Sequence, residues 1–176
     1  GWRASDTRSV FFKDLQLSKE SILGNPEKGF KQFLKTLTSG RVTIGALSLG
    51  TAQGAYQAAL KYSDERVAFG KKINKFQAIS FKLADMAVGI QAAKHLVYHA
   101  AWKKDQGLEI IKEAAMAKLF SSELAMKVTT EAIQIHGGYG YIEDYEVERF
   151  FRDAKILEIG EGTSEIQRII IGREIL

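Results

Sequence analysis

The sequence predicts an all-α fold: an up-and-down four-helix bundle with additional short helices, preceded by a short β segment. Three observations lead to this prediction. The only proline is Pro26, and after it apolar residues recur at intervals of three and four, as on one face of a helix. The stretch before it alternates apolar and polar residues, as strands do. The helical stretches are long and their joints short, which favours antiparallel neighbours.

The composition fits one globular unit of 176 residues, with 45% hydrophobic and 26% charged residues. The formal net charge of +4 comes from basic residues spread along the chain, without the basic block of a nucleic-acid-binding arm. We therefore expect no nucleic-acid partner. The absence of cysteine excludes disulfides and thiol catalysis. No apolar run approaches the ~20 residues that span a bilayer, so no membrane insertion is expected.

The N-terminal stretch, residues 7–17, carries Val10, Phe12, Leu15 and Leu17 in near alternation with polar neighbours. This pattern predicts one or two short strands. Because an isolated strand pair buries too little surface to be stable, these strands would need partners from elsewhere. The sequence therefore suggests that residues 1–25 are the remnant of a β-domain of a longer protein.

The first long helix is predicted over residues 27–62. Its apolar stripe is Phe30, Leu34, Leu37, Ile44, Leu47 and Ala55. Arg41 falls on this stripe, where a charge is costly unless it is paired or bound to an anion. Arg41 is therefore either salt-bridged to another helix or part of a site.

Four further helices follow in the sequence. Residues 76–103 have the stripe Ile79, Leu83, Met86, Ile90, Ala93 and Val97. Residues 108–135 have the stripe Ile111, Ala115, Leu119, Ser122, Met126, Thr129 and Ile133. Shorter helices are predicted near 147–157 and from 162 to about 174. Close helix approach is expected at Gly45, Gly50, Gly54 and Gly89.

Glu161 stands between Gly160 and Gly162 at the start of the last helix. Flanking glycines let a flat ligand approach the backbone closely, so Glu161 is a candidate catalytic base on a loop. Ser164 and Gln167 have the spacing of a capping box, and free N–H groups at the helix start suit a phosphate or carbonyl oxygen. The alternative is that Glu161 only complements the helix dipole.

The joint between the first two long helices contains Arg66 and Phe69, followed by Gln77. Arginine binds phosphate in a bidentate manner and phenylalanine offers a flat surface to a ring, so this segment suits a nucleotide. The alternative is a basic helix–helix turn without a ligand.

A glycine-rich turn follows Gln134 at the end of the third long helix. Gly137 and Gly138 can bring backbone N–H groups against a pyrophosphate, although Gly137 alone would also be an ordinary helix C-cap. His95 and His99 are four residues apart, but no third ligand stands at a suitable spacing, so no metal site is expected.

Three motifs occur in one order: Arg66-x-x-Phe69-Gly70 with Gln77, Gln134-x-x-Gly137-Gly138-x-Gly140, and Arg152-Asp153 followed by Glu161-Gly162-Thr163. Together they resemble the acyl-CoA dehydrogenase family. The resemblance covers essentially all 176 residues, because Gly1 to Thr7, Phe12-Lys13-Asp14, Leu23-Gly24 and Gly29-Phe30 are similar to the end of the family's middle β-domain. It implies that residues 1–25 belong to that domain and residues 26–176 to the C-terminal helical bundle.

The resemblance also implies roles for individual residues. Glu161 matches the base that removes the α-proton of an acyl-CoA thioester while hydride passes from the β-carbon to FAD. Arg41 and Gly162 match positions near the substrate. Some branches of the family carry the base at the position of Gly40, which leaves Glu161 without a rival. The positions that match FAD contacts are Arg66, Phe69, Gln77, Gln134, Gly137, Gly138, Thr163 and Glu165.

The family further implies a homodimer or homotetramer formed through the bundle, and an electron-transfer flavoprotein as electron acceptor. A short or branched acyl group is expected, in the bacterial cytoplasm or, for a eukaryotic source, the mitochondrial matrix. We expect this chain alone to fold and associate but to show little activity, because absent domains would form much of the flavin site. The alternatives are an acyl-CoA oxidase or a related flavoenzyme such as a monooxygenase, and a non-catalytic helical oligomerisation module.

Overall fold

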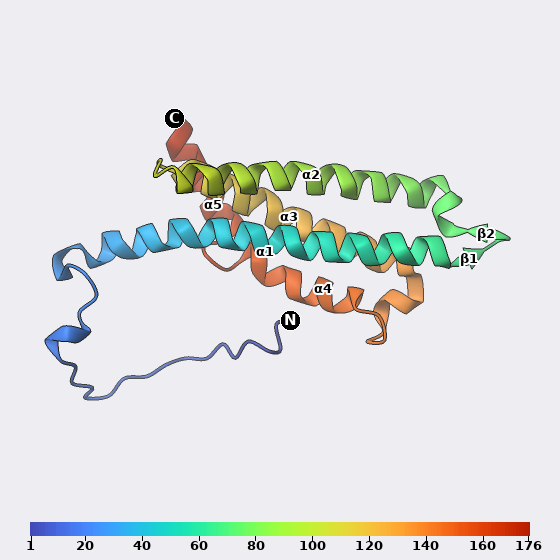
Figure 1. Ribbon diagram of the computed structural model, residues 1–176. Coiled ribbons are helices and arrows are strands. Elements are labelled where there is room, and N and C mark those ends of the chain that lie inside the picture. The colour runs from blue at the N-terminus through green and yellow to red at the C-terminus, as the bar shows by residue number, and fades with distance from the viewer.

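The computed structural model describes residues 1–176 and consists mainly of helices (Figure 1). Three long helices lie side by side and two shorter ones follow them. Their bounds are α1 (Gly29–Glu65), α2 (Gln77–Asp105), α3 (Ile111–His136), α4 (Val147–Ala154) and α5 (Ser164–Ile175). The all-α bundle predicted from apolar periodicity is confirmed, with the third long helix beginning three residues later than expected. None of these helices combines the length and apolar character needed to cross a bilayer.

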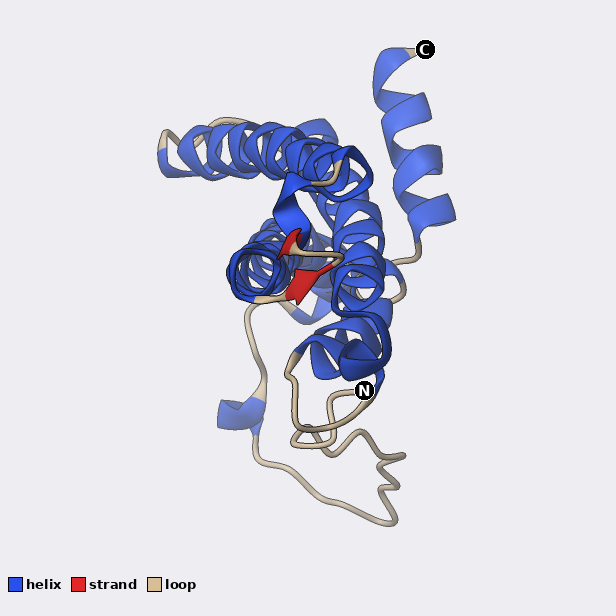
Figure 2. Ribbon diagram, turned by 90° about the vertical axis from the view of Figure 1, so that its right-hand side faces the viewer, coloured by secondary structure: helices blue, strands red, loops and turns tan.

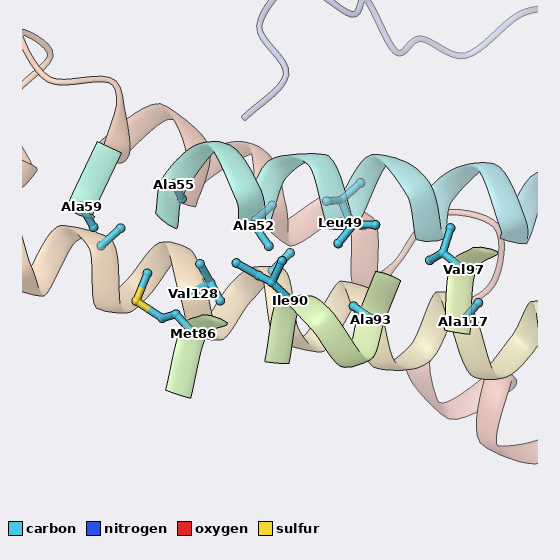
Figure 3. Close-up of a cluster of buried hydrophobic side chains, with 14 of the residues drawn as sticks. Leu49, Ala52, Ala55, Ala59, Met86, Ile90, Ala93, Val97, Ala117 and Val128 are labelled. Atoms are coloured by element: carbon cyan, nitrogen blue, oxygen red, sulfur yellow. The ribbon is translucent and has the colours of Figure 1, made fainter. Parts of the chain in front are cut away.

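Helix α3 is the centre of the bundle, because α1, α2, α4 and α5 all contact it. Alanine and serine line most of its circumference, and their small side chains let its neighbours approach closely. Figure 3 shows Ala52 and Leu49 of α1 facing Ile90 of α2 and Val128 of α3 across the core. Helix α5 stands to one side of this bundle in Figure 2.

Three of the four glycines predicted at close helix contacts do lie at such contacts. A Cβ added to Gly45 would lie 3.4 Å from the backbone of Ala117, and Cβ atoms on Gly54 and Gly89 would collide with aromatic or leucine side chains at 2.9 and 2.5 Å. Gly50 has no neighbour within 4 Å, so the prediction was wrong there.

Five of the six residues in the predicted stripe of α2 are buried, namely Leu83, Met86, Ile90, Ala93 and Val97, and the sixth, Ile79, is half-buried. In α1 the buried apolar residues are Val42, Leu49, Ala52, Ala55 and Ala59, of which Ala55 belongs to the predicted stripe. The expectation that Phe30, Leu34 and Leu47 face the core was wrong, since all three are exposed. The first turns of α1 project beyond the end of α2 (Figure 1), and helical period alone does not reveal whether a neighbour covers a face.

The strands predicted within residues 7–17 do not form; this stretch is extended coil, followed by a single 3₁₀ turn at Lys19–Ser21. A strand needs a ladder partner, and this stretch has none in the chain. The only strands, β1 (Val67–Ala68) and β2 (Lys71–Lys72), form an antiparallel hairpin between α1 and α2 (Figure 2, in red). The N-terminal end returns to α4, where the Trp2 amide donates a hydrogen bond to Asp153 Oδ1.

Candidate functional site

The Glu161 turn, residues 159–163, connects a 3₁₀ helix (Lys155–Glu158) to α5. Glu161 has a φ of +56° and Gly162 a φ of +93°, so both adopt left-handed torsions. Glycine adopts such torsions freely, whereas glutamate incurs a strain of about 1–3 kcal/mol. Because strained residues of this kind cluster at functional sites, the torsion makes Glu161 a candidate functional residue.

The helix that follows is capped by Thr163, whose Oγ1 accepts a hydrogen bond from the Ile166 amide at 3.4 Å. The prediction that Ser164 is the cap was wrong by one residue. Thr163 is the first residue after the left-handed pair with extended torsions, which is the usual N-cap conformation. Glu165 lies in the first turn, where its charge complements the helix dipole.

The Glu161 carboxylate lies directly over α1. A Cβ added to Gly40 would lie 2.7 Å from Glu161 Oε2, so only glycine leaves room for the carboxylate there. The neighbouring Arg41 is 7% exposed, and its Nε atom has no hydrogen-bond partner. Burial lowers the pKa of Arg41, while the negative charge of Glu161 opposes that shift.

The two explanations offered for Arg41 can now be compared. Arg41 makes no ion pair with another helix, and its one hydrogen bond, from Nη1 to Thr38 Oγ1, is long at 3.4 Å. A buried guanidinium with an unused N–H fits a site that receives an acceptor oxygen from a ligand. The geometry therefore favours the second explanation, that Arg41 is part of a site.

Two fully buried side chains hold the turn from beneath. Lys118 of α3 donates from Nζ to the Gly162 carbonyl at 2.8 Å. Gln167 of α5 donates from Nε2 to the carbonyls of Glu161 at 3.1 Å and Gly162 at 2.9 Å. Sequence reasoning missed Lys118, one of three lysines on α3, because the sequence alone does not distinguish it from the exposed Lys127 on the same helix.

A second group of predicted residues lines a cavity of about 450 Å³ at the far end of α3. Arg66, Gly137 and Gly138 all border it, and the Arg66 guanidinium stands 5.5 Å from the centre of the Tyr139 ring. His136 stacks on Tyr62 with ring centres 4.2 Å apart, and burial lowers the pKa of His136. A cation, an aromatic surface and open backbone together suit a nucleotide phosphate.

Each glycine of the turn after α3 is required, or permitted, for a different structural reason. Gly137 has a φ of +62°, which favours glycine. A Cβ on Gly140 would lie 2.6 Å from the Ile133 carbonyl, so packing against α3 requires a glycine there. A Cβ on Gly138 would meet nothing within 4 Å. Gly138 is thus not needed by the packing, and it leaves space beside the cavity for a ligand.

The remaining predicted residues lie on the surface near this cavity or at α5. Phe69, at the hairpin tip, has a φ of +50° and is 95% exposed. Gln77 begins α2 and Gln134 lies in the last turn of α3, and both are exposed. Lys118 and His136 are 18 residues apart on α3, which at ~1.5 Å per residue separates the two groups by roughly 27 Å.

No cluster of three side chains able to ligate a metal is present. His95 lies 3.0 Å from the Gln91 amide nitrogen, and His99 stacks on Trp102. Both histidines therefore have structural neighbours on α2.

These features define a helical-bundle domain with two separate candidate sites. One is the Glu161 turn beside Arg41, and the other is the cavity beside the glycine-rich turn at the end of α3. The family model described as "Acyl-CoA dehydrogenase, C-terminal domain" matches residues 27–176. The chain belongs to this family.

Individual relatives agree with this assignment. The probable acyl-CoA dehydrogenase YngJ of Bacillus subtilis is 54% identical over all of this chain, which covers 46% of that protein. The short-chain specific acyl-CoA dehydrogenase of Megasphaera elsdenii is 49% identical over the whole chain, again 46% of its length. The structure of butyryl-CoA dehydrogenase from Megasphaera elsdenii superposes with a TM-score of 0.92 at 51% identity, covering 93% of this chain and 43% of that one. The chain thus spans about half the length of these relatives.

Proposed function

We propose that this chain is the C-terminal bundle of an FAD-dependent acyl-CoA dehydrogenase that introduces an α,β double bond into a short-chain acyl-CoA thioester. Relatives at 49% and 48% identity are named short-chain specific acyl-CoA dehydrogenases. In this proposal residues 26–176 form the bundle and residues 1–25 belong to the preceding β-domain. The enzyme would act in a bacterial cytoplasm or a mitochondrial matrix, since relatives come from both bacteria and mitochondria.

The observation that carries the proposal is the placement of Glu161. Its carboxylate is held by a strained backbone over Gly40, beside a buried cation with an unused donor. A general base must be held within hydrogen-bond reach of the proton that it removes. In the proposed reaction Glu161 takes the α-proton of the thioester, and Arg41 and Gly162 border the acyl group.

The residues of this chain also fit the cofactor. FAD, when bound, would accept the hydride from the β-carbon. Arg66, Gly137 and Gly138 would hold a phosphate-bearing part at the cavity, with Phe69, Gln77 and Gln134 at its edge. Thr163 and Glu165 would lie near a nucleotide at the start of α5. One structural relative, 29% identical with a TM-score of 0.89, is described as "PigA with FAD and proline".

The separation of roughly 27 Å between the two groups supports an assembly in which protomers share each flavin. The fully exposed Phe69 could then reach a cofactor held by a second protomer. Helix α2 also exposes large apolar side chains, namely Phe81, Val88, Tyr98 and Trp102, which suit association of bundles into a dimer or tetramer. The electron acceptor would be an electron-transfer flavoprotein, since a relative is named as a subunit of a caffeyl-CoA reductase-Etf complex.

The test compares the full-length enzyme with its Glu161→Gln variant. Butyryl-CoA should bleach the flavin absorbance of the parent, whereas the variant should retain flavin and show no bleaching. Unchanged bleaching by the variant would rule out Glu161 as the base. Rapid reoxidation of the reduced parent by oxygen would instead indicate an oxidase.

A further inference from the structure

The carbonyl groups of the Glu161 turn point inward, toward two buried donors. Gln167 Nε2 donates to the carbonyls of both Glu161 and Gly162. Lys118 Nζ is a second donor to the Gly162 carbonyl. All peptide bonds in the chain are trans, so the N–H that follows each carbonyl points the opposite way. The Gly162 amide is therefore turned away from Gln167 and the Thr163 amide away from Lys118 and Gln167, and neither amide donates a hydrogen bond within the chain.

The fold itself does not need Lys118. The Gly162 carbonyl already has a partner in Gln167 at 2.9 Å, so losing the lysine would not leave that carbonyl unpaired. A fully buried ammonium is costly, and Lys118 has no carboxylate partner to offset that cost. Burial lowers the pKa of Lys118, the charge of Glu158 opposes this shift and the charge of Arg41 adds to it.

The buried charge of Lys118 lowers the stability of the fold, and the carbonyl that it bonds already has another donor. A residue of this kind is expected to be kept for function. We propose that Lys118 is a positioning residue: by fixing the Gly162 carbonyl from beneath, it holds the Glu161 turn so that the carboxylate stays over Gly40 and the amide N–H groups of Gly162 and Thr163 face away from the buried donors. This inference rests on the proposed function of Glu161 as the base. Lys118 itself touches neither the carboxylate nor a substrate.

The experiment replaces Lys118 by methionine in the full-length enzyme, with Lys127→Met as the matched control. Lys127 lies on the same helix and is exposed. Stopped-flow reduction of the flavin by butyryl-CoA, and by its α-deuterated form, gives the limiting rate, the apparent substrate affinity and the isotope effect. Hydrogen exchange of residues 159–168 reports the order of the turn, because the amides of Ile166 and Gln167 both donate to Thr163.

For Lys118→Met we expect the limiting rate of flavin reduction to fall about 100-fold, as for a base displaced by about 1 Å. Apparent substrate affinity should change by less than about threefold, since the lost interaction acts on proton removal rather than on binding. Flavin content and thermal stability should stay at or above the parent values, the isotope effect should not decrease, and exchange at Ile166 and Gln167 should accelerate. Lys127→Met should match the parent throughout.

A second variant, Gln167→Leu, removes the other donor and should also slow flavin reduction and accelerate exchange in the turn. A Lys118→Met enzyme that fails to fold, or that loses stability in step with activity, would make the lysine structural and overturn the proposal. A reduction rate within about threefold of the parent would overturn it as well. If Glu161→Gln still bleaches, the proposed function fails, while the exchange measurement still decides whether Lys118 holds the turn.

Discussion

Replacing Gly40 with alanine should separate the stability of the bundle from its chemistry. The new Cβ would lie 2.7 Å from Glu161 Oε2, whereas ordinary van der Waals contact begins near 3.4 Å, so the carboxylate has to move by at least 0.7 Å. Glu161 is half-buried and its side chain can swing outward. A misplacement of about 1 Å costs a reaction roughly 100-fold, so we expect flavin reduction to slow by about 10- to 100-fold.

The stability of the same variant should change in the opposite direction. Gly40 lies in the interior of α1, where alanine is favoured over glycine by about 0.8–1.0 kcal/mol. Gly50 is the matched control, because it lies on the same helix and a Cβ there would meet nothing within 4 Å. Gly50→Ala should therefore raise the free energy of unfolding in urea by about this amount. The difference between the gains of Gly50→Ala and Gly40→Ala then measures the free energy of displacing the carboxylate.

The assay is the reduction of enzyme-bound flavin by butyryl-CoA, measured beside flavin content for both variants. Gly50→Ala should reduce its flavin at the parent rate. If Gly40→Ala is equally fast, the carboxylate does not need its place over α1, and the argument that links the Glu161 geometry to catalysis fails.

The remaining predictions concern the cavity at the far end of α3. Gly138→Ala should leave the fold intact but weaken FAD retention. Gly140→Ala should destabilise the chain by about 1–3 kcal/mol, because its Cβ would collide with the Ile133 carbonyl. Equal unfolding midpoints for the two variants would contradict this contrast. Burial lowers the pKa of His136 below its ordinary value of 6.5, so the unfolded chain binds the extra proton first and stability should fall as the pH drops below about 6.5. His136→Phe should flatten that slope in denaturation curves recorded from pH 7 to 5. Arg66→Leu should raise the dissociation constant for FAD, by fluorescence titration of the full-length enzyme, without changing the bundle's melting temperature.

The helices and the stripe of α2 could be predicted because apolar spacing reports directly on a buried helical face. The same reasoning failed for the start of α1, where Phe30 and Leu34 have helical spacing but no neighbour in the chain covers them. It failed for residues 7–17 for a related reason, since alternation predicts a strand only where a partner strand is present. Local pattern describes what a segment can bury, and tertiary structure decides what it does bury.

The candidate site was predictable only in part. Glycines beside Glu161 marked the turn, and the charge of Arg41 on an apolar stripe marked its place in the site. The capping residue was misplaced by one position, because Thr163 directly after the left-handed Gly162 already has the extended torsions of an N-cap, so the helix begins one residue earlier than a cap at Ser164 predicts. Lys118 was missed altogether, since its importance comes from a hydrogen bond across 44 residues of sequence.

The central position of α3 has a consequence for engineering this protein. Both groups of candidate residues adjoin that helix, one through the Lys118 hydrogen bond and the other at its C-terminal end, and most of its circumference is packed against neighbours. Random substitutions there would therefore damage the fold and both sites together. A mutational library aimed at a different acyl substrate should leave α3 unchanged. It should instead vary α1 before Gly40, where the exposed face can absorb new side chains and the chain runs toward the carboxylate.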